Sequence, residues 1–282
     1  MRDRLLRDGY VILAVVFVGL RLFSIEPWAD SVDAYAYWTT RTGEFYATAE
    51  TGRIGAYLYS PAFAQALAPL VVLPLAFFTA IWTAINFAAL WWLLRRWALP
   101  SLLFLPIPFE IISGNVHLLY AVAIVAGFRY PATWALMLLT KVTPGIGLLW
   151  FLARREWRAL AIALGVTAAI VAVSFVLDRS AWEHWIAILR SDLAGAGQGS
   201  IQTPGWYLAV PLLPRLAVAA LITVAAALTD RRWLLPVAVV IALPVVWMNG
   251  LAVLAAVVPL WLARSRPVEH RLQAPVAQVS EQ

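Results

Sequence analysis

Long apolar runs follow one another along most of this chain, and short groups of arginines separate them. The longest runs are residues 62–97, 131–153, 160–177 and 206–228. A helix of about 20 apolar residues spans a bilayer, and a water-soluble domain has no core that would bury so many such runs. Because 63% of the 282 residues are hydrophobic and only 13% are charged, the sequence predicts an all-α, polytopic integral membrane protein.

The arginine groups predict how the chain is oriented in the membrane. They lie at residues 2–7, 154–158, 231–232 and 264–271, and such groups mark cytoplasmic loops. Counting crossings between them gives about ten transmembrane helices with both termini in the cytoplasm. We expect one transmembrane domain over residues 1–266, with outer loops at 26–61 and 178–203, and a disordered cytoplasmic tail at 267–282.

One arginine pair does not fit this count. We expect two helices between residues 62 and 97, with a turn near Leu73 and Pro74. Two crossings there place Arg95 and Arg96 outside, against the rule that cytoplasmic loops carry the positive charges.

Composition also excludes several kinds of function. The chain has no cysteine, and therefore no disulfide, thiolate ligand or cysteine nucleophile. Its three histidines show no metal-ligand spacing, so we expect no metal and no cofactor. The net charge of +6 resides in clusters between apolar runs, which argues against a nucleic-acid partner.

The first outer loop is rich in carboxylates and rings. Its stretch DSVDAYAYWTT predicts a short amphipathic helix, capped by Asp30 or Ser31, with Tyr37 and Trp38 at headgroup depth. Asp30, Asp33 and Tyr37 follow one another about one turn apart and share a face. Such a carboxylate acts as a general base toward an alcohol if rings desolvate it, whereas the alternative is a set of solvated loop charges.

Lys141 is the only lysine in the chain, and it lies near the middle of an apolar run. A charge at that depth costs roughly 3 kcal/mol or more, so it needs an anionic partner. One candidate is an ion pair with Glu110 or a loop carboxylate. The other is a phosphate contact, next to a helix backbone opened by Pro144.

Two histidines occupy different settings. His117 follows Gly114 and Asn115 in an apolar stretch, where a lone histidine is more often a satisfied polar group than a ligand. His184 lies between Trp182 and Trp185 in the second outer loop, either in an interfacial helix or facing the site that the first outer loop closes.

Four motifs occur in order along the chain: DAYAYW in the first outer loop, YLYSPAF at the next apolar run, SGNVHLLYA, and TWALMLLTKVTPGIGLLWFLARREWRA. In this order they resemble glycosyltransferase family 87, the polyprenyl-phosphate-mannose-dependent mannosyltransferases of the GT-C superfamily. The resemblance covers roughly residues 10 to 180. Serine replaces one proline of the family's tyrosine-proline-proline motif at Tyr59, Ser60 and Pro61, and His117 replaces an asparagine.

The resemblance implies a function. A sugar, mannose in the family, would pass from a polyprenyl-phosphate donor to a hydroxyl of a glycolipid or glycan acceptor, with inversion, at the periplasmic or extracellular face of the cell membrane. Asp33 would be the catalytic base, and the donor phosphate would contact Lys141 together with His184 or Arg53. The remaining substrate-binding residues implied are Asp30, Tyr37, Tyr59, Asn115 and His117. Rings in the first loop, including Tyr35 and Tyr57, are expected either to stack on sugars or to anchor at the interface.

Two other classes remain open from the sequence. A membrane transporter or flippase of a lipid-linked or anionic substrate would also have broken helices and a buried lysine, although the chain has no clear internal repeat. A non-catalytic membrane subunit is the third class, because the chain is short for the family it resembles.

Overall fold

The computed structural model describes residues 1–24, 26, 29, 31–47, 49–50, 53–193, 207–208 and 210–264. This part of the chain is helical and contains no β-strand, only an isolated bridge between Tyr207 and Trp247. The expected tail at 267–282 and the end of the second outer loop lie outside the described residues. The α-helices are α1 (Arg2–Leu22), α3 (Val32–Trp38), α4 (Pro61–Val71), α5 (Leu75–Leu94), α6 (Ala98–Ser101), α7 (Pro106–Ser113), α8 (His117–Gly127), α9 (Ala135–Thr140), α10 (Leu149–Ala153), α11 (Trp157–Leu177), α12 (Arg179–Leu193), α13 (Leu212–Leu228), α14 (Leu235–Ile241) and α15 (Val257–Arg264).

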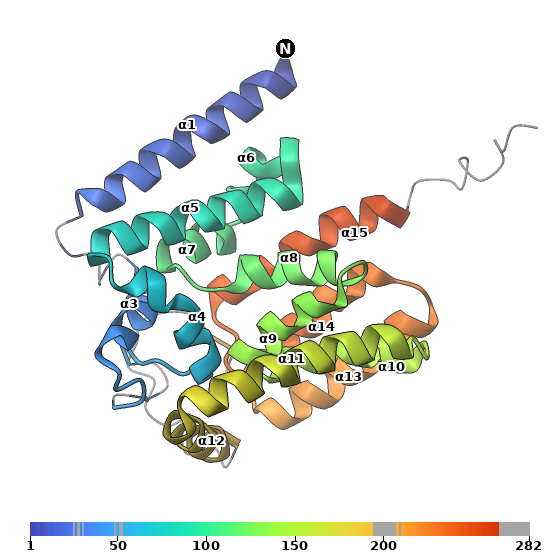
Figure 1. Ribbon diagram of the computed structural model, residues 1–282. Helices are drawn as coiled ribbons and strands as arrows, with labels where there is room; N and C mark the ends of the chain where they lie inside the picture. Colours follow the sequence, from blue (N-terminus) through green and yellow to red (C-terminus); the bar gives the residue numbers. More distant parts are fainter. Residues whose placement is uncertain are drawn as a thin grey trace, which may run out of the picture.

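Helices α1 and α5 run side by side at one edge of the molecule (Figure 1). The Tyr10 hydroxyl donates to the Phe87 carbonyl at 2.6 Å, and its ring stacks on Trp91 at 5.5 Å. Leu99 of α6 approaches Gly9, near the start of α1.

This packing corrects the expected position of the arginine pair. Arg95 and Arg96 lie in the 3₁₀ helix η2 (Arg95–Trp97), which packs against α1. The following helix, α6, also packs against α1 and contacts the N-terminal half of α1 at Gly9. The predicted turn near Leu73 and Pro74 is confirmed, because α4 ends at Val71 and α5 begins at Leu75. However, α4 has 11 residues and is about 16 Å long, too short to cross a hydrocarbon core of about 30 Å. The packing of η2 and α6 thus brings Arg95 and Arg96 to the N-terminal end of α1.

Few helices are long enough to cross a bilayer unaided. In the described part of the chain, Leu75–Ser101 and Trp157–Leu177 satisfy the length and hydropathy criteria, and α7 with α8 counts as a third span if the 110° bend between them is allowed. The expected number of about ten spans is therefore not confirmed. Most other apolar helices have 10–17 residues and are interrupted.

The break at Lys141 has a clear chemical cause. Pro144 has no N–H to donate to the Thr140 carbonyl, and its ring clashes with the carbonyl four residues earlier. The predicted run at 131–153 is accordingly divided into η3 (Pro131–Trp134), α9, η4 (Thr143–Leu148) and α10, with Lys141 extended between α9 and η4. The Leu139 carbonyl freed at this break accepts hydrogen bonds from the Ser60 N–H and hydroxyl.

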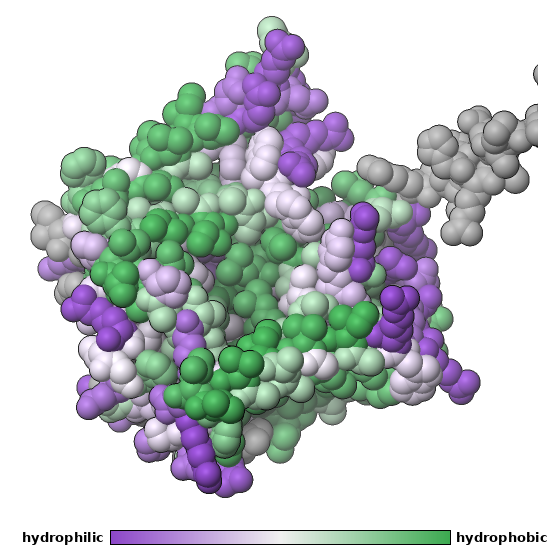
Figure 2. All heavy atoms as spheres, viewed as in Figure 1, coloured by the Kyte–Doolittle hydropathy of each residue, from purple (hydrophilic) through white to green (hydrophobic). Residues whose placement is uncertain are grey.

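Apolar side chains cover much of the visible surface, and hydrophilic ones gather toward its ends (Figure 2). On α11, Val173 and Val176 are 64% and 84% exposed. Exposed side chains of this kind along a 21-residue helix are expected where the solvent is lipid, and the fold is that of a membrane-embedded protein.

The segment expected to be the second outer loop begins with a helix. α12 covers Arg179–Leu193, and its Trp182 and Trp185 are buried against Ala62 and Leu139. The Trp185 indole N–H donates to the Leu58 carbonyl at 3.1 Å, so α12 is docked on the chain that leads into α4.

Candidate functional site

Three segments that are distant in the sequence meet in one polar cluster. They are α3 in the loop after α1, the bend between α7 and α8, and the break after α9, and Tyr59 joins them from the chain that leads into α4. Gly114 makes the close approach possible: it has φ of 72°, and a Cβ there would lie 2.8 Å from the Cβ of Ala34. Since only glycine takes this conformation without strain, it lets α3 settle on the bend. We define the polar cluster as Asp33, Tyr37, Tyr59, Glu110, Asn115, His117 and Lys141.

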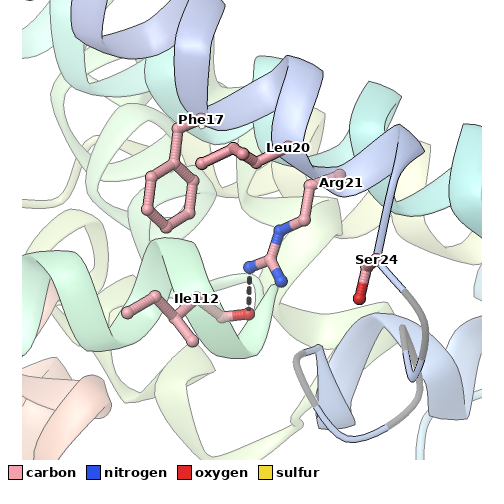
Figure 3. Close-up of a pocket in the computed structure, with 5 residues that line it drawn as sticks. All are labelled: Phe17, Leu20, Arg21, Ser24 and Ile112. Atoms are coloured by element: carbon pink, nitrogen blue, oxygen red, sulfur yellow. Dashed lines mark hydrogen bonds between the residues drawn. The ribbon is translucent and has the colours of Figure 1, made fainter.

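Hydrogen bonds to the Ile112 carbonyl fix the beginning of α3. Ser31, the residue that precedes α3, donates its hydroxyl to Ile112 at 3.1 Å and makes no capping bond to its own helix. Arg21, at the end of α1, donates to the same carbonyl at 2.8 Å (Figure 3). A surface pocket of ≈ 280 Å³ lies beside them, lined by Phe17, Leu20, Arg21, Ser24 and Ile112. These bonds tie α1 and α3 to the last turn of α7.

Asn115 is the central residue of the polar cluster. Asn115 is 3% exposed, and its side chain lies near enough to the Asp33 carboxyl to lower the pKa of Asp33. Because a carboxylate only accepts, the Asn115 amide NH₂ faces Asp33. The amide oxygen accepts from the Val116 N–H at 2.8 Å and lies 3.4 Å from Lys141 Nζ. The Asn115 side chain therefore interacts with both the Asp33 carboxyl and the Lys141 ammonium.

Asp33 is a partly buried carboxyl on α3. Burial raises the pKa of Asp33 above its ordinary value, while Lys141 and the Asn115 hydrogen bond pull that pKa back down. A carboxylate in this setting is a stronger base than one in water and still ionises, which suits proton abstraction from a hydroxyl.

Lys141 lies where the polypeptide is extended between α9 and η4. Its Nζ is 3.0 Å from His117 Nε2, and the ammonium is 5.5 Å from the centre of the Tyr59 ring. The expected direct ion pair with Glu110 is absent: among the described residues, no carboxylate oxygen lies within 4.0 Å of Lys141 Nζ. The reason is that Glu110 pairs with His117 instead, at 2.9 Å between Oε2 and Nδ1.

Tyr37 and Tyr59 close the polar cluster on one side. Tyr37 donates to the Tyr59 hydroxyl at 3.1 Å, and Tyr59 donates to Asn115 Oδ1 at 3.3 Å. Burial raises the pKa of both phenols well above their ordinary value, so they remain neutral donors. Tyr37, which was expected to be an interfacial ring at headgroup depth, is 0% exposed, as is Tyr57, so neither ring faces the surroundings of the protein. Tyr37 can be buried because its hydroxyl finds polar partners there, the Tyr59 hydroxyl and the Asn115 amide oxygen in the bend.

Two predicted phosphate-binding residues lie outside the polar cluster. Arg53 is exposed, and its nearest carboxylate is Glu50 at 3.8 Å. His184 is exposed on α12 and interacts with Asp178. Asp30, predicted to bind substrate, falls outside the described residues. The structure does bring the other predicted site residues together in the polar cluster: Asp33, Tyr37, Tyr59, Asn115, His117 and Lys141.

Sequence reasoning missed part of this site. Glu110 was expected only as a partner for Lys141, yet it accepts a hydrogen bond from the His117 N–H at the start of α8 and interacts with Asn249, whose amide donates to the Ser113 hydroxyl at 3.0 Å. Asn249 lies in η6 (Met248–Ala256), more than a hundred residues away, and no local pattern marks it. Tyr120 and Thr140 are hydrogen bonded to each other at 2.6 Å, and the Tyr120 ring packs on His117. In the sequence they do not differ from ordinary residues of an apolar helix.

The chemistry available to the polar cluster is that of a base and a fixed cation. Among the residues described, no group of three His, Cys, Asp or Glu side chains is placed to hold a metal ion. A partly buried carboxylate near a partly buried ammonium can abstract a proton and stabilise an anion.

Comparison with known proteins gives one match. The model of glycosyltransferase family 87 matches residues 57–278, which include the bend at Gly114 and Lys141 but begin after α3. The match starts later and extends further than the resemblance expected over residues 10 to 180. No curated protein and no solved structure matches the chain.

Proposed function

The chain belongs to glycosyltransferase family 87, and on this premise we propose that it transfers a sugar from a polyprenyl-phosphate donor to an acceptor hydroxyl. A membrane glycosyltransferase needs both a sugar donor and an acceptor. A lipid-linked donor suits a chain with so much lipid-facing surface, because its tail lies in the bilayer while its phosphate reaches the polar cluster. Mannose is the sugar that the family resemblance suggests, and a glycolipid or glycan is the acceptor.

The observation that carries the proposal is that Asp33 and Lys141 interact electrostatically within one polar cluster and that both interact with Asn115. In the proposed step, the Asp33 carboxylate takes the proton of the acceptor hydroxyl. The acceptor oxygen bonds to the anomeric carbon, and the bond from that carbon to the phosphate oxygen breaks with inversion. The polyprenyl phosphate leaves with the electron pair, and Lys141 stabilises its charge.

The other polar groups have supporting roles in this proposal. Tyr37, Tyr59, Asn115 and His117 orient the donor and the base through their hydrogen bonds. Asp30 is proposed to face the acceptor. Arg53 and His184 are proposed as outer contacts that attract the donor phosphate, since both are exposed cationic or titratable groups near the first and second outer loops.

The proposed orientation follows from the arginines. The N-terminal arginines, Arg95 and Arg96 lie at one end of the α1–α5 pair, and positive groups favour the cytoplasm. We place this end in the cytoplasm and the polar cluster toward the outer face of the cell membrane, within a GT-C-like domain of residues 1–266. Short helix pairs such as α7 with α8 would supply the remaining spans of a polytopic fold.

A transfer assay tests the proposal. Membranes with the wild-type chain are given labelled polyprenyl-phosphate mannose and an extract of membrane glycolipids, and are compared with membranes that contain Asp33→Asn or Glu44→Gln. Glu44 is an exposed carboxylate of the same loop and serves as the matched control. We expect transfer from the wild type and Glu44→Gln, and a loss of at least about 100-fold in Asp33→Asn. Full transfer by Asp33→Asn would contradict the assignment of the base.

A transporter is the competing function, favoured by the 110° bend between α7 and α8 and the break at Lys141. It predicts movement of the intact lipid-linked sugar across vesicles with no new glycoside. A non-catalytic subunit predicts neither result.

A further inference from the structure

Glu110 is a buried carboxylate to which the proposed reaction assigns no task. It is 0% exposed, lies at the end of α7, and accepts from the first N–H groups of α8. Its position at the N-terminus of a helix has a purely structural explanation, since an anion there stabilises the helix. The bond from Glu110 to the His117 ring goes beyond that explanation.

The side chains of Glu110, His117 and Lys141 form a continuous line of hydrogen bonds. Glu110 Oε2 lies 2.9 Å from His117 Nδ1, and His117 Nε2 lies 3.0 Å from Lys141 Nζ. An ammonium has only N–H groups to offer, so Nε2 must accept. The ring proton of neutral His117 is then on Nδ1, where it is donated to Glu110. The carboxylate thus fixes the tautomer that accepts the lysine.

We propose that Glu110 is a positioning residue for sugar transfer: through His117 it holds the Lys141 ammonium beside the base without letting it pair with Asp33. The inference rests on the proposed function of the polar cluster. The charged or titratable groups around Lys141 are Asp33 from α3, Glu110 from α7, His117 and Tyr120 from α8, and Tyr59. A direct Lys141–Asp33 pair would occupy both the base and the cation that the leaving phosphate needs.

Glu110→Gln tests the tautomer argument at one atom. The carboxylate gives separate oxygens to the His117 backbone N–H and to Nδ1. Glutamine has one oxygen, which the backbone N–H retains, and its NH₂ then faces Nδ1. His117 is driven to carry its proton on Nε2, so that two donors face each other and Lys141 moves away.

Lys141 reports this movement directly because it is the only lysine. Protein labelled with ¹⁵N at the lysine side chain and free of lysine in any tag gives a single Nζ resonance. We expect Glu110→Gln and His117→Gln each to shift it. Thr223→Val is the control, because Thr223 is buried in α13 and donates within that helix to the Ala219 carbonyl at 2.8 Å, and it should leave the resonance unchanged. An unmoved resonance in Glu110→Gln would overturn the proposal.

A double-mutant cycle separates action through His117 from direct action. We expect Glu110→Gln to lower kcat/KM by about 10- to 100-fold, as loss of an orienting partner commonly does. In His117→Gln the amide oxygen accepts from Lys141 without a tautomer to fix, so adding Glu110→Gln should cost little more. Multiplicative losses would refute the relay through His117. If Glu110→Gln does not fold, Glu110→Asp keeps the charge but withdraws it from Nδ1, and the same resonance shift and cycle apply.

The experiments distinguish failure of the proposed transferase function from failure of the proposed role of Glu110. The resonance experiment needs no substrate, so it retains its meaning if the wild type transfers no sugar. Conversely, a wild type that transfers sugar, an inactive Asp33→Asn and a multiplicative cycle would leave the transferase standing and remove only the role of Glu110.

Discussion

Two cations of this chain, one buried and one partly buried, have surroundings that differ in kind. Arg215, in the first turn of α13, is 5% exposed and donates to the carbonyls of Val210, Ile241, Leu243 and Pro244 at 2.6–2.9 Å. Lys141 bonds to the side chains of Asn115 and His117. Neither has a carboxylate oxygen within 4.0 Å among the described residues.

This difference separates a structural cation from a functional one. Backbone carbonyls cannot leave their cation without rearranging the chain, and the five donors of a guanidinium match several of them at once. Arg215 therefore joins the end of α14 to the start of α13. Side-chain partners on the bend can rearrange when a substrate arrives, and a lysine suits a single phosphate oxygen. Burial of a charge alone does not identify a site; the partners do.

The largest effect is expected when Arg215 is replaced by methionine. Four carbonyls would lose their donor in a medium without water, which costs about 3 kcal/mol or more. Arg215→Met should abolish accumulation of folded protein, measured by size-exclusion chromatography in detergent and by thermal unfolding. If Arg215→Met folds as the wild type does, the structural role assigned to Arg215 is wrong.

Lys141→Met should have the opposite profile. We expect the protein to fold, because removing a partly buried charge relieves its desolvation, while kcat/KM falls about 100- to 1000-fold through loss of the fixed cation. Lys141 lowers the pKa of Asp33, so its removal raises that pKa. Asp33 acts when deprotonated, and activity is lost as the pH falls through its pKa. The acid limb of the pH–rate profile should therefore move to higher pH; movement to lower pH would disprove the coupling.

Gly114→Ala probes how the first outer loop reaches the site. The new Cβ would lie 2.8 Å from that of Ala34, at a φ of 72° that alanine tolerates poorly. We expect a loss of about 1 kcal/mol in stability and about tenfold in kcat, because α3 and Asp33 are displaced together. Gly43→Ala is the control, since Gly43 also has positive φ but meets no atom within 4 Å. Gly43→Ala should lower the stability of the protein and leave kcat unchanged.

The smallest effects are expected for the exposed groups. Arg53→Gln and His184→Gln should raise the KM for the donor by less than about fivefold and leave kcat unchanged, because exposed charges interact weakly through water. A large fall in kcat in either variant, assayed beside Lys141→Met, would show that the outer loops close over the polar cluster during transfer.

Several features followed from the sequence because their causes are local. Lys141 stands alone in an apolar run, and Pro144 interrupts the helix beside it wherever that run is placed. The carboxylate–tyrosine spacing of α3 and the SerGlyAsn bend also depend on a few neighbouring residues. Together they were enough to select most members of the polar cluster.

The partners were decided by the tertiary structure. Whether Lys141 meets Glu110, Asp33 or His117 depends on how α7, α8 and the break after α9 approach one another, and the bend of 110° is a property of their packing. The burial of Tyr37, the bond from distant Asn249 and the position of Arg95 beside α1 have the same origin. Sequence periodicity reports which face of an element avoids water; in a chain that is apolar throughout, it says little about which polar groups find each other.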